Sequence, residues 1–275
     1  MHTPLCKHAE GHPILYMEHG VANGLAGIVM TCHSPMPNGF SSRVRMAPEQ
    51  FDDYVAMVDE ATEAAPPGFE VLLGLESDFF PGMEPWLREL HERADFHYIL
   101  GSVHWHIPEY IDAFWRGDPF SFQRQYFDHL AESAESGLFD CLAHPDLVKN
   151  ASPTEWRLER ILPFIERSLD RIAETGVAME LNTSGLNKSF PEMNPGPEIL
   201  ALMAERGISV VIGSDSHTPL RVADGFHAAL DTLEEAGYGA VSLFRNRERR
   251  EIAIADARPG RAMAEQACGR AAYFR

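Results

Sequence analysis

The strongest constraint on this chain is a recurring order of apolar strand, polar side chain, loop and helix. Its clearest copy spans residues 209–217, where β-branched residues lead through Gly-Ser to Asp215 and His217. The apolar run predicts a buried strand. Because alternate residues of an extended chain point the same way, Asp215 and His217 can converge, as a carboxylate and an imidazole do around a metal. Alone, such a pair is more often a loop cap or a hydrogen-bonded pair, so the interpretation depends on repetition.

Four earlier predicted strands end beside a residue of the same chemical type. In chain order these are 26–31 with His33, 70–75 with Glu76, 97–103 with His104, and 138–143 with His144. A further strand at 177–181 ends in Asn-Thr-Ser. A last strand is predicted at 240–244, followed by an arginine-rich tail that is expected to be peripheral.

Helices separate these strands, with a longer excursion over 107–119. The helix at 155–175 contains Pro163 and is expected to be interrupted or kinked there. Strands alternating with helices pair in parallel through right-handed crossovers, and closing such a series gives a barrel with its chemistry at the carboxyl ends of the strands. The sequence therefore predicts an α/β barrel, as a single domain over residues 1–275. The predicted helices are 13–23, 48–65, 84–94, 120–136, 155–175, 197–206 and 221–236.

The charge of the chain disfavours several classes of partner. A formal net charge of −18 repels polyanions, which argues against nucleic acid and against a nuclease or polymerase-associated role. The same acidity hinders a small phosphorylated substrate unless cations in the site offset it, which favours a metal cluster over a pocket of arginines alone. The sequence has no apolar run of membrane-spanning length, and residues 1–8 lack the features of a secretory signal. A cytoplasmic protein without a membrane partner is expected.

The cysteines are expected to be reduced, because none has the CxxC spacing of a zinc knuckle and they suggest no disulfide framework. They are Cys6, Cys32, Cys141 and Cys268.

Residues of the types that bind metals are predicted to lie together at the mouth of the barrel. They are His33, Glu76, His104, His144, Asp215 and His217. His2 and His8 can join them from the N-terminal loop. Crowding imidazoles and carboxylates there is costly in desolvation unless something pairs them, and divalent metals do so. Such a set suits Zn, Fe or Mn better than Mg or Ca, and it exceeds one tetrahedral centre, so two or three ions are expected. Clustered ions can bridge a hydroxide for attack, which predicts hydrolysis. The other histidines are interpreted as core or surface residues, and they are His12, His19, His91, His97, His106, His129 and His227.

Several motifs together resemble one family, the PHP-domain phosphoesterases, and within it the PHP-type histidinol-phosphate phosphatases. The resemblance implies a distorted (β/α)7 barrel with a trinuclear metal centre that hydrolyses L-histidinol phosphate to L-histidinol and phosphate in histidine biosynthesis. The motifs, from residue 2 to residue 217, are His-Thr-Pro-Leu-Cys-Lys-His-Ala, Thr-Cys-His-Ser-Pro-Met-Pro, Gly-Leu-Glu-Ser-Asp, Gly-Ser-Val-His, Ala-His-Pro-Asp-Leu, Leu-Asn-Thr-Ser-Gly-Leu and Gly-Ser-Asp-Ser-His.

The resemblance also implies roles for individual residues. The ligands of the three ions would be His2, Glu76 and Asp215, then Glu76, His104 and His144, then His8, His33 and His217. The residues expected at the reacting centre, where a metal-bridging hydroxide attacks phosphorus, are Glu76, His104, Asp215 and His217. Candidate cations for the phosphate oxygens are Arg43, Arg45, Lys149 and Lys188.

The chain departs from the family pattern at three places. The family begins with a strand and Asp-x-His-x-His, whereas this sequence starts at the second of those histidines, so the first strand is missing and an upstream segment is expected. Cys32 stands where the family usually has Asp, and a thiol orients a ligand or handles a proton poorly unless its pKa is lowered. Asn187 and Lys188 stand where the family has an arginine.

These departures keep other functions open. One alternative is a PHP hydrolase of another phosphate ester or of an amide. Another is a degenerate PHP module that binds metal or a phosphorylated ligand with little turnover.

Overall fold

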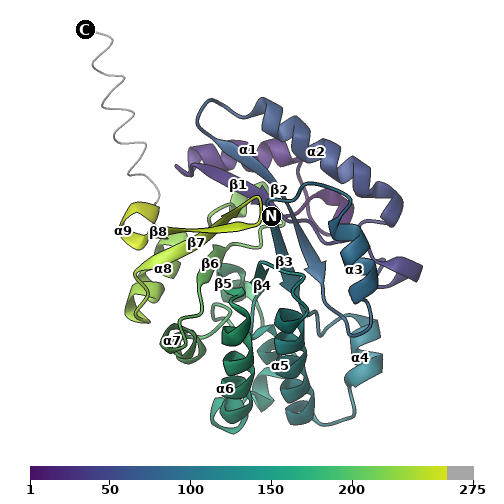
Figure 1. The fold of residues 1–275 in the computed structure, drawn as a ribbon, viewed down its shortest axis with the longest axis vertical. Helices are drawn as coiled ribbons and strands as arrows, with labels where there is room; N and C mark the ends of the chain where they lie inside the picture. Colours follow the sequence, from purple (N-terminus) through teal and green to yellow (C-terminus); the bar gives the residue numbers. More distant parts are fainter. Residues whose placement is uncertain (259–275) are drawn as a thin grey trace.

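Six parallel strands form a curled sheet, and their order across the sheet is their order along the chain (Figure 1). The structure is a computed structural model that describes residues 1–258. Each neighbouring pair of strands is parallel, as the alternation of strands and helices predicted. The strands are β1 (Gly27–Met30), β2 (Glu70–Asp78), β3 (Tyr98–Ser102), β4 (Cys141–Leu142), β5 (Ala178–Asn182) and β6 (Val210–Gly213).

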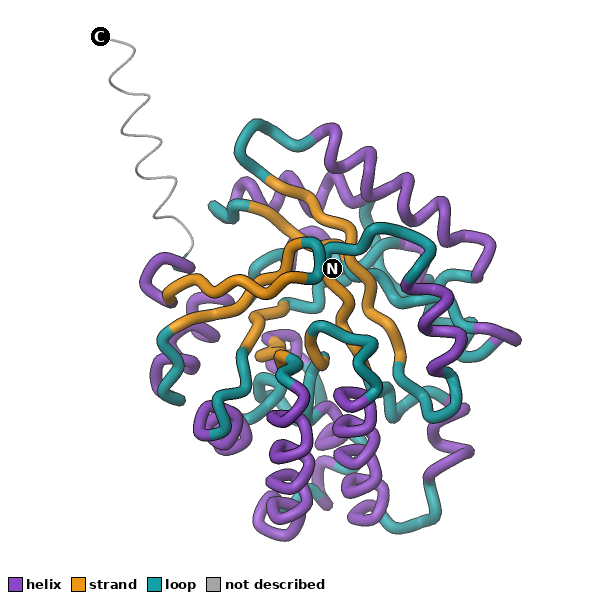
Figure 2. The backbone as a smooth tube through the Cα atoms, in the orientation of Figure 1, coloured by secondary structure: helices purple, strands orange, loops and turns teal. Residues whose placement is uncertain are grey.

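Helices cover the outside of the curl, around the strands at its centre (Figure 2). Four of the helices, α1, α4, α5 and α7, begin with a proline, which suits the first helical position because the N–H that proline lacks has no intrahelical partner there. The helices are α1 (Pro13–Ala22), α2 (Phe51–Ala64), α3 (Glu84–His91), α4 (Pro108–Phe114), α5 (Pro119–Glu135), α6 (Leu158–Thr175), α7 (Pro197–Glu205), α8 (Phe226–Glu235) and α9 (Ile254–Ala257).

The sheet has apolar packing on both faces, as expected for parallel strands. On β3, Ile99 belongs to the large core between the sheet and the helices, whereas Tyr98 and Leu100 belong to a smaller cluster inside the curl. This inner cluster also contains Cys141 of β4 and Ala178 of β5.

An antiparallel hairpin closes the amino-terminal end of the curl. It consists of β7 (Ala240–Arg245) and β8 (Glu248–Ala253). Phe244 enters the inner cluster and stacks on Tyr98 with ring centroids 5.3 Å apart. Arg247 Nε donates to Asp140 Oδ2 at 2.8 Å, just before β4, and Arg249 donates to the carbonyl of Gly176, just before β5. The predicted strand at 240–244 is therefore present, but as part of a plug and not as a further parallel strand of the barrel.

Several predicted boundaries differ from the structure for local reasons. β2 continues past Glu76 to Asp78, because β3 pairs with it as far as Ser102. The predicted helix at 221–236 begins only at Phe226, after Gly225 at φ +75°.

Other differences concern the middle of the chain. Of the two outcomes expected at Pro163, an interruption is wrong, since α6 runs through Pro163 without a break, and a kink stays a prediction. The excursion over 107–119 contains α4. The strand predicted at 138–143 is reduced to β4, because the Asp140 side chain takes the place of a strand carbonyl and accepts from Ile99 N at 2.7 Å.

The N-terminal residues lie between the two edge strands of the sheet, β1 and β6. Thr31 N donates to Met1 O at 2.7 Å, and His2 N donates to Ser216 O at 3.0 Å. Residues 1 and 2 thus bridge the carboxyl ends of β1 and β6. The upstream strand expected from the sequence stays a prediction.

The single domain over 1–275 also stays a prediction, because residues 259–275, including Cys268, lie outside the described part. Among residues 1–258, no helix has both the length and the apolar composition that crossing a membrane requires. Cys6, Cys32 and Cys141 are free and buried.

The packing of the β7–β8 hairpin against the inside of the sheet predicts which substitution in it lowers the stability of the protein. Phe244→Ala removes a ring that is 7% exposed, so the free energy of unfolding in urea should fall by about 3 kcal/mol. Leu243→Ala, on the solvent side of the same strand at 36% exposed, should cost less than about 1 kcal/mol. Equal losses from the two variants would contradict a plug that is held by its inner face.

Candidate metal centre

The carboxylate of Glu76 lies at the centre of the candidate site. Glu76 is 2% exposed and stands near the carboxyl end of β2. Its Oε1 lies 3.3 Å from His104 Nε2 and 3.2 Å from His144 Nε2. Its Oε2 lies 3.3 Å from His2 Nε2 and 3.3 Å from His33 Nδ1. Four imidazoles from separate parts of the chain therefore converge on one carboxylate.

The remaining predicted ligands lie beside this group. Asp215 Oδ1 is 3.0 Å from His2 Nε2 and 3.5 Å from His217 Nδ1. The His217 ring stacks on the rings of His2 and His8, with centroids 3.9 Å and 4.5 Å apart. The His8 ring lies 5.2 Å from that of His33. The structure thus gathers every residue predicted as a ligand at the carboxyl ends of the strands.

A second carboxylate on β2 orients one of these imidazoles. Asp78 follows Glu76 by two residues, so both side chains point to the same face of the strand. Asp78 Oδ1 pairs with His104 Nδ1 at 3.0 Å and accepts from Ser102 Oγ at 3.1 Å, while its Oδ2 pairs with Arg45. This carboxylate fixes the His104 ring so that Nε2 faces Glu76.

Backbone strain accompanies two of the clustered residues. His144 has φ +30° and Asp215 has φ +45°. These values lie in or near the left-handed region, which side chains other than glycine rarely adopt unless the surroundings impose it.

The electrostatics of the cluster follow from burial and crowding. Burial by itself raises the pKa of the Glu76 carboxyl, but His33, His104 and His144 outweigh it and hold that pKa well below its usual range. Burial lowers the pKa of His33 far below the ordinary value and that of His217 to about 3. Those two rings are therefore neutral near pH 7, so their unprotonated nitrogens can act as ligands.

The donor set fits divalent cations. Five sets of three ligand atoms within residues 1–258 lie within 4.8 Å of one another, and two of them include cysteine. The three sets without cysteine are His33 with Glu76 and His104, His2 with Glu76 and Asp215, and His2 with His33 and His217. His217 Nε2 is buried and has no hydrogen-bond partner among residues 1–258, and the buried His33 Nδ1 has only its 3.3 Å contact with Glu76 Oε2, which lacks hydrogen-bond geometry. Neutral imidazoles and carboxylates with unused lone pairs form the ligand chemistry of zinc and similar metals.

The predicted phosphate-binding cations lie in different surroundings. Arg45 is buried and paired with Asp78, and Lys149 is fully buried with Nζ 2.9 Å from Asp146 Oδ2. Both are already neutralised by protein carboxylates, so neither is free for a substrate. Arg43 is exposed and forms no hydrogen bond or ion pair with a cluster residue within residues 1–258. Lys188 is closest to the site, with Nζ 4.0 Å from Asp215 Oδ2.

Sequence reasoning assigned no role to several polar residues that contact the predicted ligands. Asp78 is one, and Glu180 and Ser184 are others, on β5 and in the turn after it. The sequence did contain a signal for two of these residues. Asp78 stands two residues after Glu76, and Glu180 stands two residues before Asn182, which is the same spacing that drew attention to Asp215 and His217.

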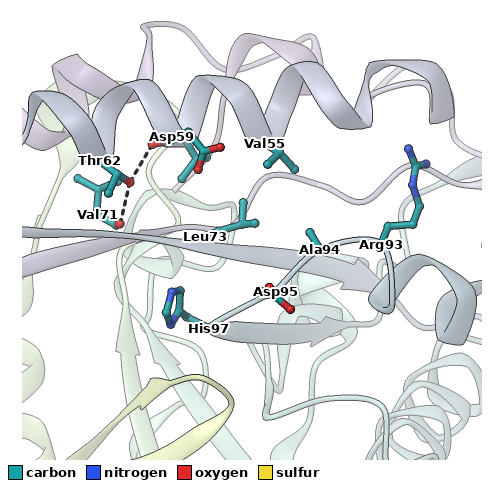
Figure 3. A pocket seen from close by; sticks show the side chains of 10 residues that line it. Val55, Asp59, Thr62, Val71, Leu73, Arg93, Ala94, Asp95 and His97 are labelled. Atoms are coloured by element: carbon teal, nitrogen blue, oxygen red, sulfur yellow. Dashed lines mark hydrogen bonds between the residues drawn. The ribbon is translucent and has the colours of Figure 1, made fainter.

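A separate cavity of about 400 Å³ lies at the other end of β2. Figure 3 shows Val55 and Thr62 of α2 facing Val71 and Leu73 of β2, where Thr62 Oγ1 donates to the carbonyl of Val71. No predicted ligand lines this cavity.

Comparison with known proteins agrees with this geometry. The PHP domain family matches residues 1–184. The chain belongs to the PHP domain family. The resemblance inferred from the motifs is thus confirmed at the level of the family.

Two curated relatives have names that describe one activity. A Deinococcus radiodurans protein named "Probable histidinol-phosphatase" is 35% identical over 254 residues, covering 90% of this chain and 96% of that protein. A Bacillus subtilis protein named "Histidinol-phosphatase" is 24% identical over 262 residues, covering 84% of this chain and 97% of that protein.

A solved structure confirms the predicted fold class. It is a histidinol phosphate phosphatase from Lactococcus lactis in complex with zinc, L-histidinol and phosphate, with a TM-score of 0.75 at 18% identity. The match covers 91% of this chain and 97% of that chain. The curled sheet of six parallel strands described above therefore has the fold of this solved structure.

The central position of Glu76 predicts a loss of metal. Glu76→Gln keeps the shape of the side chain but removes its charge, so metal bound per chain should fall by at least half when elemental analysis follows loading with Zn²⁺ and gel filtration. Asp140→Asn makes the same change at the opposite end of the barrel and should leave the metal content unchanged. Identical metal contents for wild type and Glu76→Gln would exclude Glu76 as a ligand.

Proposed function

We propose that this protein is a histidinol-phosphatase that hydrolyses L-histidinol phosphate to L-histidinol and phosphate, as a cytoplasmic enzyme of histidine biosynthesis. The observation that carries the proposal is the convergence of His2, His33, His104 and His144 on Glu76. Its support comes from the family membership, the names of the relatives and the ligands of the Lactococcus lactis protein.

In this proposal two or three divalent ions, Zn, Fe or Mn, are held by the clustered side chains. Glu76 would be shared between a group with His2 and Asp215 and a group with His104 and His144, while His8, His33 and His217 would form the third. When bound, such ions supply a nucleophile from water at neutral pH and withdraw charge from the phosphoryl oxygens.

The protein's own residues then hold the reacting groups in place. Asp78 keeps His104 directed at Glu76, which fixes the ligand geometry before substrate arrives. Asp215 and His217 lie at the mouth beside Lys188, so their ligand atoms would hold a metal ion close to the place where the phosphate binds. We therefore propose Glu76, His104, Asp215 and His217 as the residues at the reacting centre.

Lys188 is the cation that we propose for the phosphate. Its side chain is 32% exposed, and it stands close to Asp215 without a buried partner of the kind that holds Lys149. An ammonium group there offsets the acidity of the chain and donates charge-assisted hydrogen bonds to phosphate oxygens.

Hydrolysis itself is tested by phosphate release. The Zn²⁺-loaded chain should release phosphate from L-histidinol phosphate faster than from a panel of other phosphomonoesters, when compared by kcat/KM. Removal of metal with a chelator should abolish release, and added Zn²⁺ should restore it. Preference for a different ester would reassign the substrate, and metal binding without turnover on any ester would favour the degenerate module.

Lys188 has a separate prediction. Lys188→Ala should lower kcat/KM about ten- to hundredfold, mainly by raising KM, because a charged hydrogen bond to the phosphate is lost. Lys188→Arg should keep most of the activity, since it preserves the charge. Arg171→Ala, which removes a cation of α6 that pairs with Glu135 of α5, is the control for loss of a positive charge and should keep the wild-type kcat/KM. An unchanged KM in Lys188→Ala would remove Lys188 from phosphate binding.

A further inference from the structure

β5 supplies none of the predicted ligands, although it lies between β4, which precedes His144, and β6, which precedes Asp215. Its polar residues nevertheless reach both neighbours. The contacts run through Glu180 and Asn182 on the strand and Ser184 in the turn after it.

Glu180 contacts the backbone of one predicted ligand. Its side chain is buried, with the residue 4% exposed. Glu180 Oε2 accepts from His144 N at 2.9 Å and from Asn182 Nδ2 at 2.9 Å. Glu180 Oε1 packs against Gly213, where an added Cβ would lie only 1.7 Å from that oxygen. The carboxylate is thus fixed between β4 and β6.

The contacts continue to the second predicted ligand. Asn182 Oδ1 accepts from Ser184 N at 2.9 Å, and Ser184 Oγ donates to Asp215 Oδ2 at 3.0 Å. An unbroken series of hydrogen bonds therefore joins the backbone of His144 to the carboxylate of Asp215.

Both ends of this series are the strained residues. The unusual φ of His144 and of Asp215 places each side chain in the cluster, and such conformations persist only where neighbouring groups impose them. Glu180 bonds the peptide N–H at the strained residue His144, so it controls the plane of the peptide that directs this imidazole. Ser184 instead bonds the side chain of Asp215, and its hydroxyl orients that carboxylate.

A buried carboxyl group is an expensive way to fill space. Burial raises the pKa of Glu180, which reflects the cost of keeping its charge away from water. An apolar side chain would pack here without that cost, but it would leave His144 N and Asn182 Nδ2 without this acceptor.

We propose that Glu180 is a positioning residue of the metal centre. Through His144 on one side, and through Asn182 and Ser184 to Asp215 on the other, it holds ligands from two strands in register with Glu76. The inference rests on the proposed role of these residues as metal ligands, but not on the identity of the substrate.

The test compares metal retention with stability in two substitutions at the same position. Glu180→Leu removes the acceptor and should weaken Zn²⁺ affinity about ten- to hundredfold, measured by titration against a competing chelator. Glu180→Gln keeps an oxygen that can accept from His144 N and Asn182 Nδ2, so its affinity should stay within a few-fold of wild type. Wild-type affinity in Glu180→Leu, or an equally large loss in Glu180→Gln, would overturn the proposal.

A control separates positioning from general loss of packing. Leu181→Ala truncates the next residue of β5, which is 0% exposed and belongs to the large core between the sheet and the helices. It should lower the urea midpoint while leaving Zn²⁺ affinity near wild type. If it loses metal as strongly as Glu180→Leu at matched fractions folded, the role of β5 is structural only.

A further variant avoids the buried carboxyl in case Glu180→Leu does not fold. Ser184→Ala removes one hydroxyl and should weaken Zn²⁺ affinity about tenfold through Asp215. Unchanged affinity in that variant would break the series at its last bond and overturn the link to Asp215. Because all these readouts are metal affinities, they decide the role of Glu180 even if wild type proves inactive on L-histidinol phosphate.

Discussion

The site depends on one desolvated carboxylate surrounded by imidazoles. Glu76 cannot be buried at low cost by itself, and the rings around it cannot be crowded together without a source of compensating charge. The fold solves this by taking His33, His104 and His144 from the ends of three different strands and His2 from the N-terminal segment, so that no single loop has to carry the cluster. The parallel sheet is therefore the means by which distant residues reach one point.

The supporting residues form a distinct group beside this cluster. Asp78 orients the ring of His104, and Glu180 on β5 fixes the backbone N–H of His144, just after the neighbouring strand β4. Arg45 and Lys149 carry positive charge, but each forms an ion pair with a buried carboxylate. The cations of the chain thus have two different roles: the buried ones stabilise the scaffold, and the half-buried Lys188 lies beside Asp215 at the mouth.

Much of this was predictable from residue spacing. Apolar runs ending in His33, Glu76, His104, His144 and Asp215 gave the parallel order and the cluster, because strand ends in such a sheet share one edge. The hairpin was not predictable in the same way, because the exposed strand β8 has no apolar run and its role depends on where Phe244 inserts. The ion pairs of Arg45 and Lys149 were not predictable either, since a sequence does not reveal which carboxylate a cation will pair with.

The position of the hairpin in the chain has a consequence for synthesis. The inner wall of the sheet is apolar, with Tyr98 and Leu100 among its members, and Phe244 covers it only after all six parallel strands have left the ribosome. A nascent chain halted before β7 would therefore expose an apolar concave surface. Chaperones bind such surfaces, which also promote association between incomplete chains. Protection from such encounters comes last, from a segment that takes no part in the chemistry.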